Sequence, residues 1–158
     1  GYRASPDDAY LVIRGLRTLD VRLEKHEKNT KEVIKFLIKQ KKIIEVLYPY
    51  KKGTKNYKNW KKYYKGATGL LGLVIKAKSK NSVFKFINKL ELFGIGYSWG
   101  GFESLAIFQE LKQSKDEYSQ GRRFFKYNKN EHIVRLHIGL EDPKDLIEDL
   151  KKSLRYVK

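Results

Sequence analysis

Two short segments of the chain carry residue types that could bind a carboxylate. The first is Tyr97-Ser98-Trp99-Gly100-Gly101-Phe102-Glu103-Ser104, in which an aromatic residue, a hydroxyl and two glycines follow the strand-like segment Leu92 to Gly96. Glycine has no Cβ, so such a turn lets the backbone approach a ligand closely, and successive main-chain N–H groups in it form a concavity that holds an anion. Taken alone, this segment indicates a binding loop without specifying its ligand.

The second segment, Val134 to Asp142, alternates apolar and polar residues with period two, which predicts a strand. Arg135 and His137 then share one face, while Leu136 and Ile138 share the opposite face. An arginine on such a face can point into a cleft. Its planar guanidinium matches a carboxylate with two parallel hydrogen bonds, which a lysine does not provide.

Together the two segments resemble the cystathionine beta-lyase family, pyridoxal-phosphate enzymes of sulfur amino-acid metabolism and methionine biosynthesis, and specifically their C-terminal domain. Related gamma-lyases and gamma-synthases usually carry a Ser-Leu-Gly-Gly turn and a serine-valine-glycine run after the arginine. Ser98-Trp99-Gly100-Gly101 and Leu136-His137-Ile138-Gly139 are therefore closer to the beta-lyase branch. Phe108 to His132 departs from the family in composition. The likeness also covers Ser5 to Tyr10, Arg14 to Leu19, Trp60 to Tyr64 and Gly66 to Leu70.

The resemblance implies substrate-binding roles for four residues. Arg135 would hold the α-carboxylate of an amino-acid substrate, and Ser98 would lie beside that carboxylate. Trp99 and Tyr97 would form walls of the pocket. From the residues alone, Arg135 could equally be a strand arginine paired with a surface acid. His137 would support the site without transferring a proton.

Five further positions have structural interpretations. Glu103 is expected to hold the turn through backbone N–H groups. Thr68 and Gly69 would shape the edge of the pocket. Arg14 and Arg17 lie early in a helical region where, by the resemblance, subunits and domains of the family meet, although a solvated helix face explains them nearly as well.

The resemblance also implies what this chain does not contain. In the family, the lysine that binds pyridoxal phosphate as a Schiff base and the groups that bind its ring nitrogen and phosphate lie upstream, in a larger N-terminal domain. The chain opens at Gly1-Tyr2-Arg3 and has no methionine. We therefore expect a piece of a longer chain, or the surviving part of a split gene, with no catalytic residue and no pyridoxal phosphate bound by itself. Its partners would be the N-terminal cofactor domain, the subunits of a homo-oligomer and an amino-acid substrate.

The composition places further bounds on the chain. With 158 residues and no linker rich in proline, glycine or serine, residues 1–158 are expected to form a single domain. The absence of cysteine excludes disulfides and thiolate metal sites, and the 3 histidines show no metal-ligand spacing, so no metal is expected. No apolar run is long enough to span a membrane, which makes a cytoplasmic protein the default expectation.

The net charge of +17 raises the alternative of a basic domain that binds RNA or another polyanion. Tyr57 to Lys65 interleaves aromatic residues with lysines, as some single-strand binders do, and Arg122 and Arg123 would add to such a surface. However, lysines far outnumber arginines and are spread along most of the chain, as on solvated helix faces. Nucleic acid is therefore not the expected partner.

The elements that must position these residues can be read from caps and periodicity. Helices are expected from Ser5-Pro6, interrupted near Gly15 and continued by a long amphipathic helix, and again over Asn56 to Tyr64, after Ser79 and after Asp142-Pro143. The expected strands are Ile43 to Leu47, Leu70 to Ala77, Ile95 to Trp99, Glu103 to Ile107 and Ile133 to Ile138.

This order of elements predicts an α/β (α+β) fold: a mixed, largely antiparallel sheet of about four to five strands, covered mainly on one side by helices. The small C-terminal domain of fold type I pyridoxal-phosphate enzymes has this architecture. The function implied is that of the C-terminal domain of a carbon-sulfur beta-lyase, which converts cystathionine to homocysteine, pyruvate and ammonia. A further alternative is an assembly module for a separately encoded cofactor domain. The lyase interpretation requires Arg135 and the Ser98-Trp99-Gly100-Gly101 bend to converge on a single hollow sized for the carboxylate of an amino acid.

Overall fold

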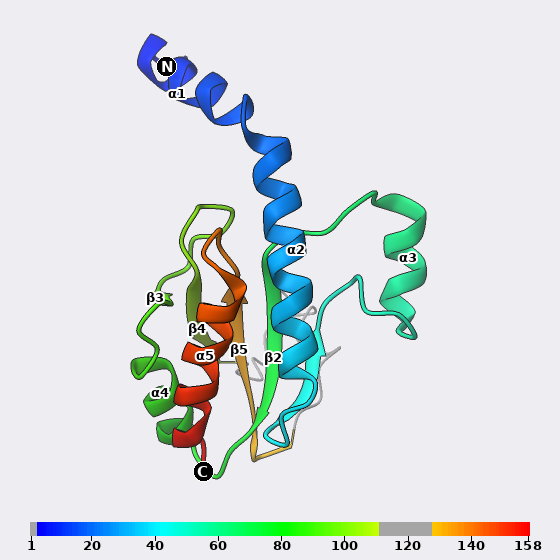
Figure 1. Cartoon of the computed structure of the whole chain (residues 1–158), viewed down its shortest axis with the longest axis vertical. Coiled ribbons are helices and arrows are strands. Elements are labelled where there is room, and N and C mark those ends of the chain that lie inside the picture. Colours follow the sequence, from blue (N-terminus) through cyan, green and yellow to red (C-terminus); the bar gives the residue numbers. More distant parts are fainter. Residues whose placement is uncertain (1–2, 111–127) are drawn as a thin grey trace, which may run out of the picture.

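A five-stranded sheet in the order β1-β2-β5-β4-β3 forms the centre of the structure (Figure 1). The computed structural model describes residues 3–110 and 128–158. Neighbouring strands are antiparallel except β3 and β4, which are parallel. The prediction of a mixed, largely antiparallel sheet is thus confirmed. The strands are β1 (Ile43–Leu47), β2 (Leu70–Lys76), β3 (Gly94–Ile95), β4 (Leu105–Gln109) and β5 (Glu131–His137).

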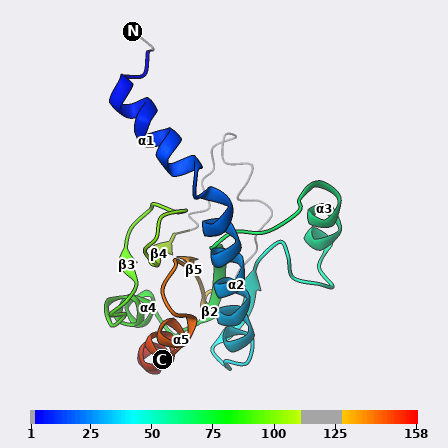
Figure 2. The same cartoon turned by 45° about the horizontal axis from the view of Figure 1, so that its top comes forward.

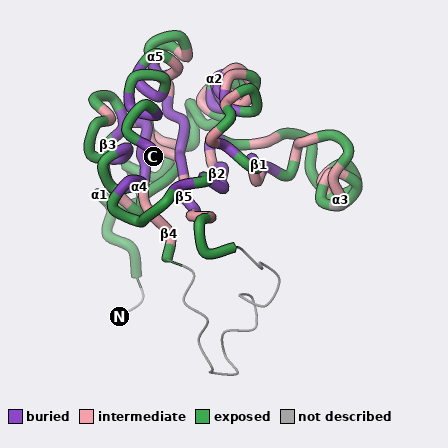
Figure 3. Tube along the Cα trace, turned by 90° about the horizontal axis from the view of Figure 1, so that it is seen from below, coloured by how far each residue is buried: buried purple, intermediate pink, exposed green. Residues whose placement is uncertain are grey.

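Three helices, α2, α4 and α5, cover one face of this sheet. Viewed along the sheet in Figure 3, α2 and α5 lie on the same side of β2 and β5. In contrast, α3 stands beside the sheet beyond β1 (Figure 3). Helix α1 extends away from the sheet past the end of α2 (Figure 2). The helices are α1 (Pro6–Leu16), α2 (Leu19–Leu37), α3 (Lys55–Tyr63), α4 (Lys80–Asn88), α5 (Pro143–Ser153) and the 3₁₀ helix η2 (Leu154–Tyr156).

The helices begin where the cap residues indicate. Ser5 and Asp8 form a reciprocal capping box at α1. Ser79 accepts a hydrogen bond from the Ser82 N–H at α4, and Asp142 accepts one from the Lys144 N–H at α5. Between α1 and α2, the break falls after Gly15, which is still within α1.

The core lies between this helical layer and one face of the sheet. Its members include buried residues from α2, α4, α5 and the central strands, and each fully buried leucine, isoleucine or phenylalanine contributes about 1.5–3 kcal/mol. Val134 and Leu136 of β5, and Ile138 directly after it, belong to this core, as their alternation predicts. The core includes Val33, Leu37, Leu73, Ile75, Phe86, Val134, Leu136, Ile138, Leu146 and Leu150.

The other face of β5 carries Arg135. Directly opposed residues on neighbouring strands point to the same side of a sheet. Arg135 pairs with Gly72 on β2 and with Ile107 on β4, so its side chain lies in the middle of the sheet face that the three helices leave uncovered.

Side-chain contacts from distant segments change the bounds of two predicted strands. The expected strand Ile95 to Trp99 ends at Ile95, because the carbonyls of Gly96 and Ser98 accept hydrogen bonds from the Arg135 side chain. The strand expected from Glu103 begins at Leu105, because the Ser104 N–H binds a side-chain carboxylate. Part of the atypical segment Phe108 to His132 lies outside the described residues.

Helix α4 ends at Asn88. Its end is fixed by α5. The buried Asp149 carboxylate accepts hydrogen bonds from the N–H groups of Glu91 and Leu92 at 2.9–3.1 Å. These bonds replace helical ones and direct the chain toward β3 and the bend that follows. Within the described residues, no helix is long and apolar enough to cross a membrane.

Candidate functional site

Arg135 lies directly beside the loop that the sequence singled out. Its Nη2 atom donates hydrogen bonds to the carbonyl oxygens of Gly96 and Ser98, both at 3.2 Å. Its Cζ atom lies 6.0 Å from the centroid of the Tyr97 ring. Its Nε atom is buried and has no hydrogen-bond partner among the described residues. The guanidinium therefore binds the bend through Nη2, while its buried Nε–H has no partner among the described residues.

The bend exposes large apolar side chains. Tyr97 is 73% exposed, Trp99 is 64% exposed and Phe102 is 74% exposed. Neighbouring apolar side chains exposed in this way mark a surface that binds a ligand or another part of a protein. The tight course of the bend depends on Gly100, whose φ of 80° lies in the left-handed region that favours glycine.

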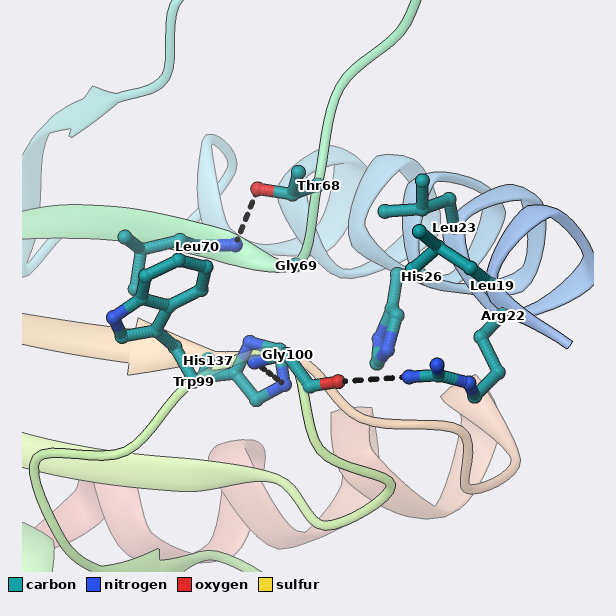
Figure 4. Close-up of a pocket in the computed structure, with 10 residues that line it drawn as sticks. All are labelled: Leu19, Arg22, Leu23, His26, Thr68, Gly69, Leu70, Trp99, Gly100 and His137. Carbon is teal, nitrogen blue, oxygen red and sulfur yellow. Dashed lines mark hydrogen bonds between the residues drawn. The ribbon is translucent and has the colours of Figure 1, made fainter. Parts of the chain in front are cut away.

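Both polar groups of the Gly100 residue are bound. The Gly100 N–H donates to Nε2 of His137 at 3.1 Å, and the Gly100 carbonyl accepts from Nη1 of Arg22 at 3.3 Å. Arg22 also donates to the carbonyl of Gly15 at 2.8 Å. Figure 4 shows Arg22 reaching from α2 to this carbonyl. The bend is thus held between β5 and the start of α2.

His137 is buried and favours its neutral form. Burial lowers the pKa of His137 from its ordinary value of 6.5, and the nearby His26 lowers it further, while the hydrogen bond to Gly101 and the carboxylates of Glu103 and Glu141 oppose the shift. The rings of His26 and His137 lie 5.0 Å apart between centroids. A neutral imidazole can accept the Gly100 N–H, which an imidazolium cannot.

A cavity of 280 Å³ opens next to the bend (Figure 4). Leu19 and Leu23 of α2 form part of its apolar wall, and Trp99 contributes from the bend. His26 and His137 also line it. Arg135 does not line the cavity but binds the bend from the uncovered sheet face, so the four predicted binding residues lie around one bend without sharing one hollow.

Thr68 and Gly69 line this cavity, as expected for residues at the edge of a pocket. The Thr68 carbonyl accepts a hydrogen bond of 2.9 Å from the Tyr48 hydroxyl. At Gly69 a Cβ atom would lie 2.3 Å from the Ile138 carbonyl oxygen and 2.8 Å from Cε1 of His137. Only glycine allows β2 and the end of β5 to approach this closely.

The carboxylate that holds the turn is Glu141, and the prediction for Glu103 is wrong. Glu141 accepts hydrogen bonds from the Ser104 N–H at 2.7 Å and from the Ser104 hydroxyl at 2.9 Å, and that hydroxyl accepts from the Gly139 N–H at 2.8 Å. Glu103 makes no hydrogen bond with the described residues, although its side chain lies against Gly101. Its negative charge acts on His137 through space.

Sequence reasoning missed the polar contacts of α2. His26 Nδ1 lies 2.7 Å from the Ile138 carbonyl, so this nitrogen carries the hydrogen. Asn29 donates to the carbonyls of Gly139 and Glu141 at 3.0 and 2.8 Å. A signal was present, since these polar residues fall at helical spacing with the buried Val33 and Leu37, on the face that enters the core. Arg14 and Arg17 are exposed, and their predicted interface remains a prediction.

The cavity beside the bend has no lysine among its lining residues. The part of the chain that the structure describes also contains no group of three or more histidine, cysteine, aspartate or glutamate residues placed to hold a metal ion. What the site offers is a guanidinium, a polar bend and aromatic walls.

Comparison with known families identifies the chain's relatives. Residues 1–155 match the family of Cys/Met metabolism PLP-dependent enzymes, and the chain belongs to this family. It is 37% identical to a cystathionine beta-lyase of Bordetella avium, covering 98% of this chain, and 36% identical to one of Escherichia coli, covering 95%. It is also 36% identical to an L-alanine/L-glutamate racemase of Wolbachia pipientis wMel, covering 98% of this chain. In each case the chain spans only 37% of the relative's length.

Solved structures support the fold. A cystathionine gamma synthase of Xanthomonas oryzae pv. oryzae, in complex with aminoacrylate and cysteine, superposes with a TM-score of 0.80 at 28% identity. The match covers 97% of this chain and 39% of that one. The five-stranded sheet with its helical layer is therefore the fold of a portion of a pyridoxal-phosphate enzyme.

Proposed function

We propose that the chain is the C-terminal domain of a pyridoxal-phosphate-dependent carbon-sulfur beta-lyase and that it holds the α-carboxylate of the substrate. The observation that carries this proposal is Arg135 on the uncovered sheet face, hydrogen-bonded to the bend that contains Tyr97, Ser98 and Trp99. Its delocalised charge and several N–H donors suit a carboxylate.

Arg135 would act by orientation. Two of its hydrogen bonds already go to carbonyls of the bend, so the guanidinium is held in place before substrate arrives. A carboxylate bound to such a fixed group has its Cα confined to few positions, and this restriction lowers the entropy cost of reaching the reactive geometry. Trp99 and Tyr97, both exposed at the bend, would form the walls around the rest of the amino acid.

The reaction of the complete enzyme would be the conversion of cystathionine and water to homocysteine, pyruvate and ammonia. Pyridoxal phosphate, when bound, supplies the electron sink for this elimination. The cofactor would be held by an N-terminal domain, on the same chain or on a separate one, and a homo-oligomer would complete the site. By itself, the chain is expected to be inactive.

The choice of a beta-lyase rests on two short runs. The relatives at similar identity are named for different reactions, so overall similarity does not select one of them. Ser98-Trp99-Gly100-Gly101 and Leu136-His137-Ile138-Gly139 resemble the beta-lyase branch, and the structure joins them through the bond from the Gly100 N–H to His137. This contact supports treating them as one unit of the site.

A hybrid enzyme tests the proposal. The chain would be fused to the remaining, N-terminal part of the Bordetella avium beta-lyase, and pyruvate formation from cystathionine would be measured. We expect the hybrid to form pyruvate and the isolated chain, with added pyridoxal phosphate, to form none. A folded hybrid that binds the cofactor but forms no pyruvate would contradict the proposal, and so would turnover by the isolated chain.

A second candidate function, binding of RNA or another polyanion, is favoured by α3. This helix stands apart from the sheet (Figure 1), and next to its lysines Tyr63 is 67% and Tyr64 is 66% exposed. Exposed tyrosines can stack on bases while lysines contact phosphates. Arg122 and Arg123 of the same hypothesis lie outside the described residues. Binding of single-stranded RNA that persists at moderate salt and is lost in Y63A/Y64A would favour this function.

A further inference from the structure

The position of the bend depends on how Gly100 is bound. Its N–H and its carbonyl are both hydrogen-bonded, to His137 of β5 and to Arg22 of α2 respectively. Gly100 lies immediately after Trp99 and two residues after Ser98. A change at either bond therefore shifts the part of the chain that carries the candidate binding residues.

His137 has two competing partners in the bend. Its Nε2 atom lies 3.1 Å from the Gly100 nitrogen and 3.2 Å from the Gly101 carbonyl oxygen. One ring nitrogen cannot serve both, because the first requires a lone pair and the second requires a hydrogen. Without a hydrogen, Nε2 accepts from Gly100. With a hydrogen, it donates to Gly101 and the Gly100 N–H loses its acceptor.

The neighbouring His26 is buried beside His137. Because His26 Nδ1 donates to the Ile138 carbonyl at 2.7 Å, its Nε2 carries a lone pair in the neutral ring. This Nε2 and the Nδ1 of His137 are both buried and have no partner among the described residues. When His137 accepts from Gly100, its Nδ1 carries the hydrogen, and the His26 ring lies 5.0 Å away between centroids.

We infer that His137 is a positioning residue for the substrate-binding bend: its neutral form holds Gly100, and its protonation moves the hydrogen bond to the Gly101 carbonyl and releases Gly100. The inference rests on the proposed function in one respect, that the bend binds substrate. The exchange of partners itself requires no substrate and can be measured without one.

The surroundings of His137 set the pH range in which its hydrogen bond changes from Gly100 to Gly101. His26 faces it from α2, Glu103 from the bend, and Glu141 from the loop after β5, while Arg22 binds the far side of Gly100. Burial is the largest influence and lowers the pKa of His137. The hydrogen bond from the Gly100 N–H to neutral His137 therefore persists below the ordinary histidine pKa of about 6.5. It is expected to break only under more acidic conditions.

An NMR titration of the whole chain tests this inference. The Gly100 amide and the His137 ring would be followed from pH 8 to pH 4.5 by isotope labelling, with far-UV circular dichroism to confirm that the chain stays folded. We expect both signals to titrate together, with a midpoint below that of an exposed histidine. A Gly100 amide that stays unchanged while His137 titrates overturns the inference.

Two variants separate positioning from simple packing. His137→Gln offers an acceptor that does not titrate, so the Gly100 amide should stay hydrogen-bonded and its NMR signal should not change with pH. His132→Gln, on the same strand, is the matched control and should leave the midpoint unchanged. If the Gly100 amide still titrates with the same midpoint in H137Q, the assignment is contradicted. A shift of this midpoint in H132Q would also contradict it. Arg135→Lys in the hybrid enzyme tests carboxylate binding separately, so the two proposals can fail independently.

Discussion

Arg135 on β5 donates a hydrogen bond of 3.2 Å to the carbonyl oxygen of Ser98, which lies 37 residues earlier in the chain. The bond uses the backbone of Ser98 and not its hydroxyl, so the position of the bend does not depend on the serine side chain. Alignment of the guanidinium with the bend is therefore a property of the fold, established before any substrate is present.

Gly100 is expected to be the most sensitive residue of the bend. Its φ of 80° is strained for a residue with a Cβ, although no atom lies within 4 Å of the Cβ position. Gly100→Ala should therefore lower the free energy of unfolding by about 1–2 kcal/mol through backbone strain alone, and Gly100→Asn by less, since asparagine tolerates this region. Urea unfolding monitored by circular dichroism measures the difference. Equal costs for both variants would argue against the strain.

Glu141 is expected to stabilise the loops on which the site stands. Glu141→Gln removes the charge that strengthens two hydrogen bonds from Ser104, and we predict a loss of about 1–3 kcal/mol in the free energy of unfolding. Glu148→Gln is the control, because Glu148 forms an exposed ion pair with Lys151 at 3.2 Å. It should cost less than about 0.5 kcal/mol. Similar losses in the two variants, measured by urea unfolding, would contradict this role.

The two glycines Gly69 and Gly15 should respond in opposite directions. In Gly69→Ala the new methyl would lie 2.3 Å from a backbone oxygen that cannot move away cheaply, so we expect a loss of more than about 2 kcal/mol. In Gly15→Ala nothing lies within 4 Å of the methyl, and the substitution within helix α1 should stabilise by about 0.5–1 kcal/mol. Thermal unfolding tests both, and a neutral G69A would show that the close approach of β2 to Ile138 is not tight.

The buried Tyr48 is expected to make the folded chain less stable at alkaline pH. Burial raises the pKa of Tyr48 above its ordinary value, so the folded state keeps a proton that the unfolded chain releases. The resulting contribution is fully present below about pH 10 and falls as the pH rises further. Tyr48→Phe, which also loses the bond to the Thr68 carbonyl, should be less stable at pH 7 but should lose less on going to pH 11. Parallel losses in the two proteins would contradict the assignment.

The sequence predicted the face of Arg135 because its evidence is local. Alternation along Val134 to Ile138 is enough to place Val134, Leu136 and Ile138 on the core side and Arg135 on the open side. His137, predicted to share the face of Arg135, is instead buried beside His26 of α2. The helix starts at Ser5 and Asp142 depend on residues within one turn and were predicted for the same reason. The resemblance to a family selected the bend.

The sequence could not predict contacts between distant segments. The strand expected to reach Trp99 is interrupted by the Arg135 side chain, which arrives from far along the chain. Glu103 is next to the turn in sequence, whereas Glu141 reaches the turn only once β4 and β5 pair. His26 was not recognised as part of the site, because a buried polar residue on a helix shows its partner only in the folded chain.

The central claim is that Arg135 recognises the α-carboxylate of the substrate. A thermodynamic cycle in the hybrid enzyme, which changes Arg135 and the substrate carboxylate separately and together, tests it most directly. The value of kcat/KM for pyruvate formation would be compared for cystathionine and for its α-carboxamide, in the wild-type hybrid and in Arg135→Lys. Arg155→Lys, an exposed arginine near the C-terminus, serves as the control.

We predict that the wild-type hybrid prefers the carboxylate by at least about 10-fold, since a charge-assisted hydrogen bond contributes about 1.5–3 kcal/mol, and that R135K loses most of this preference while R155K keeps it. A preference for the carboxylate that is the same in R135K as in the wild-type hybrid would contradict the claim.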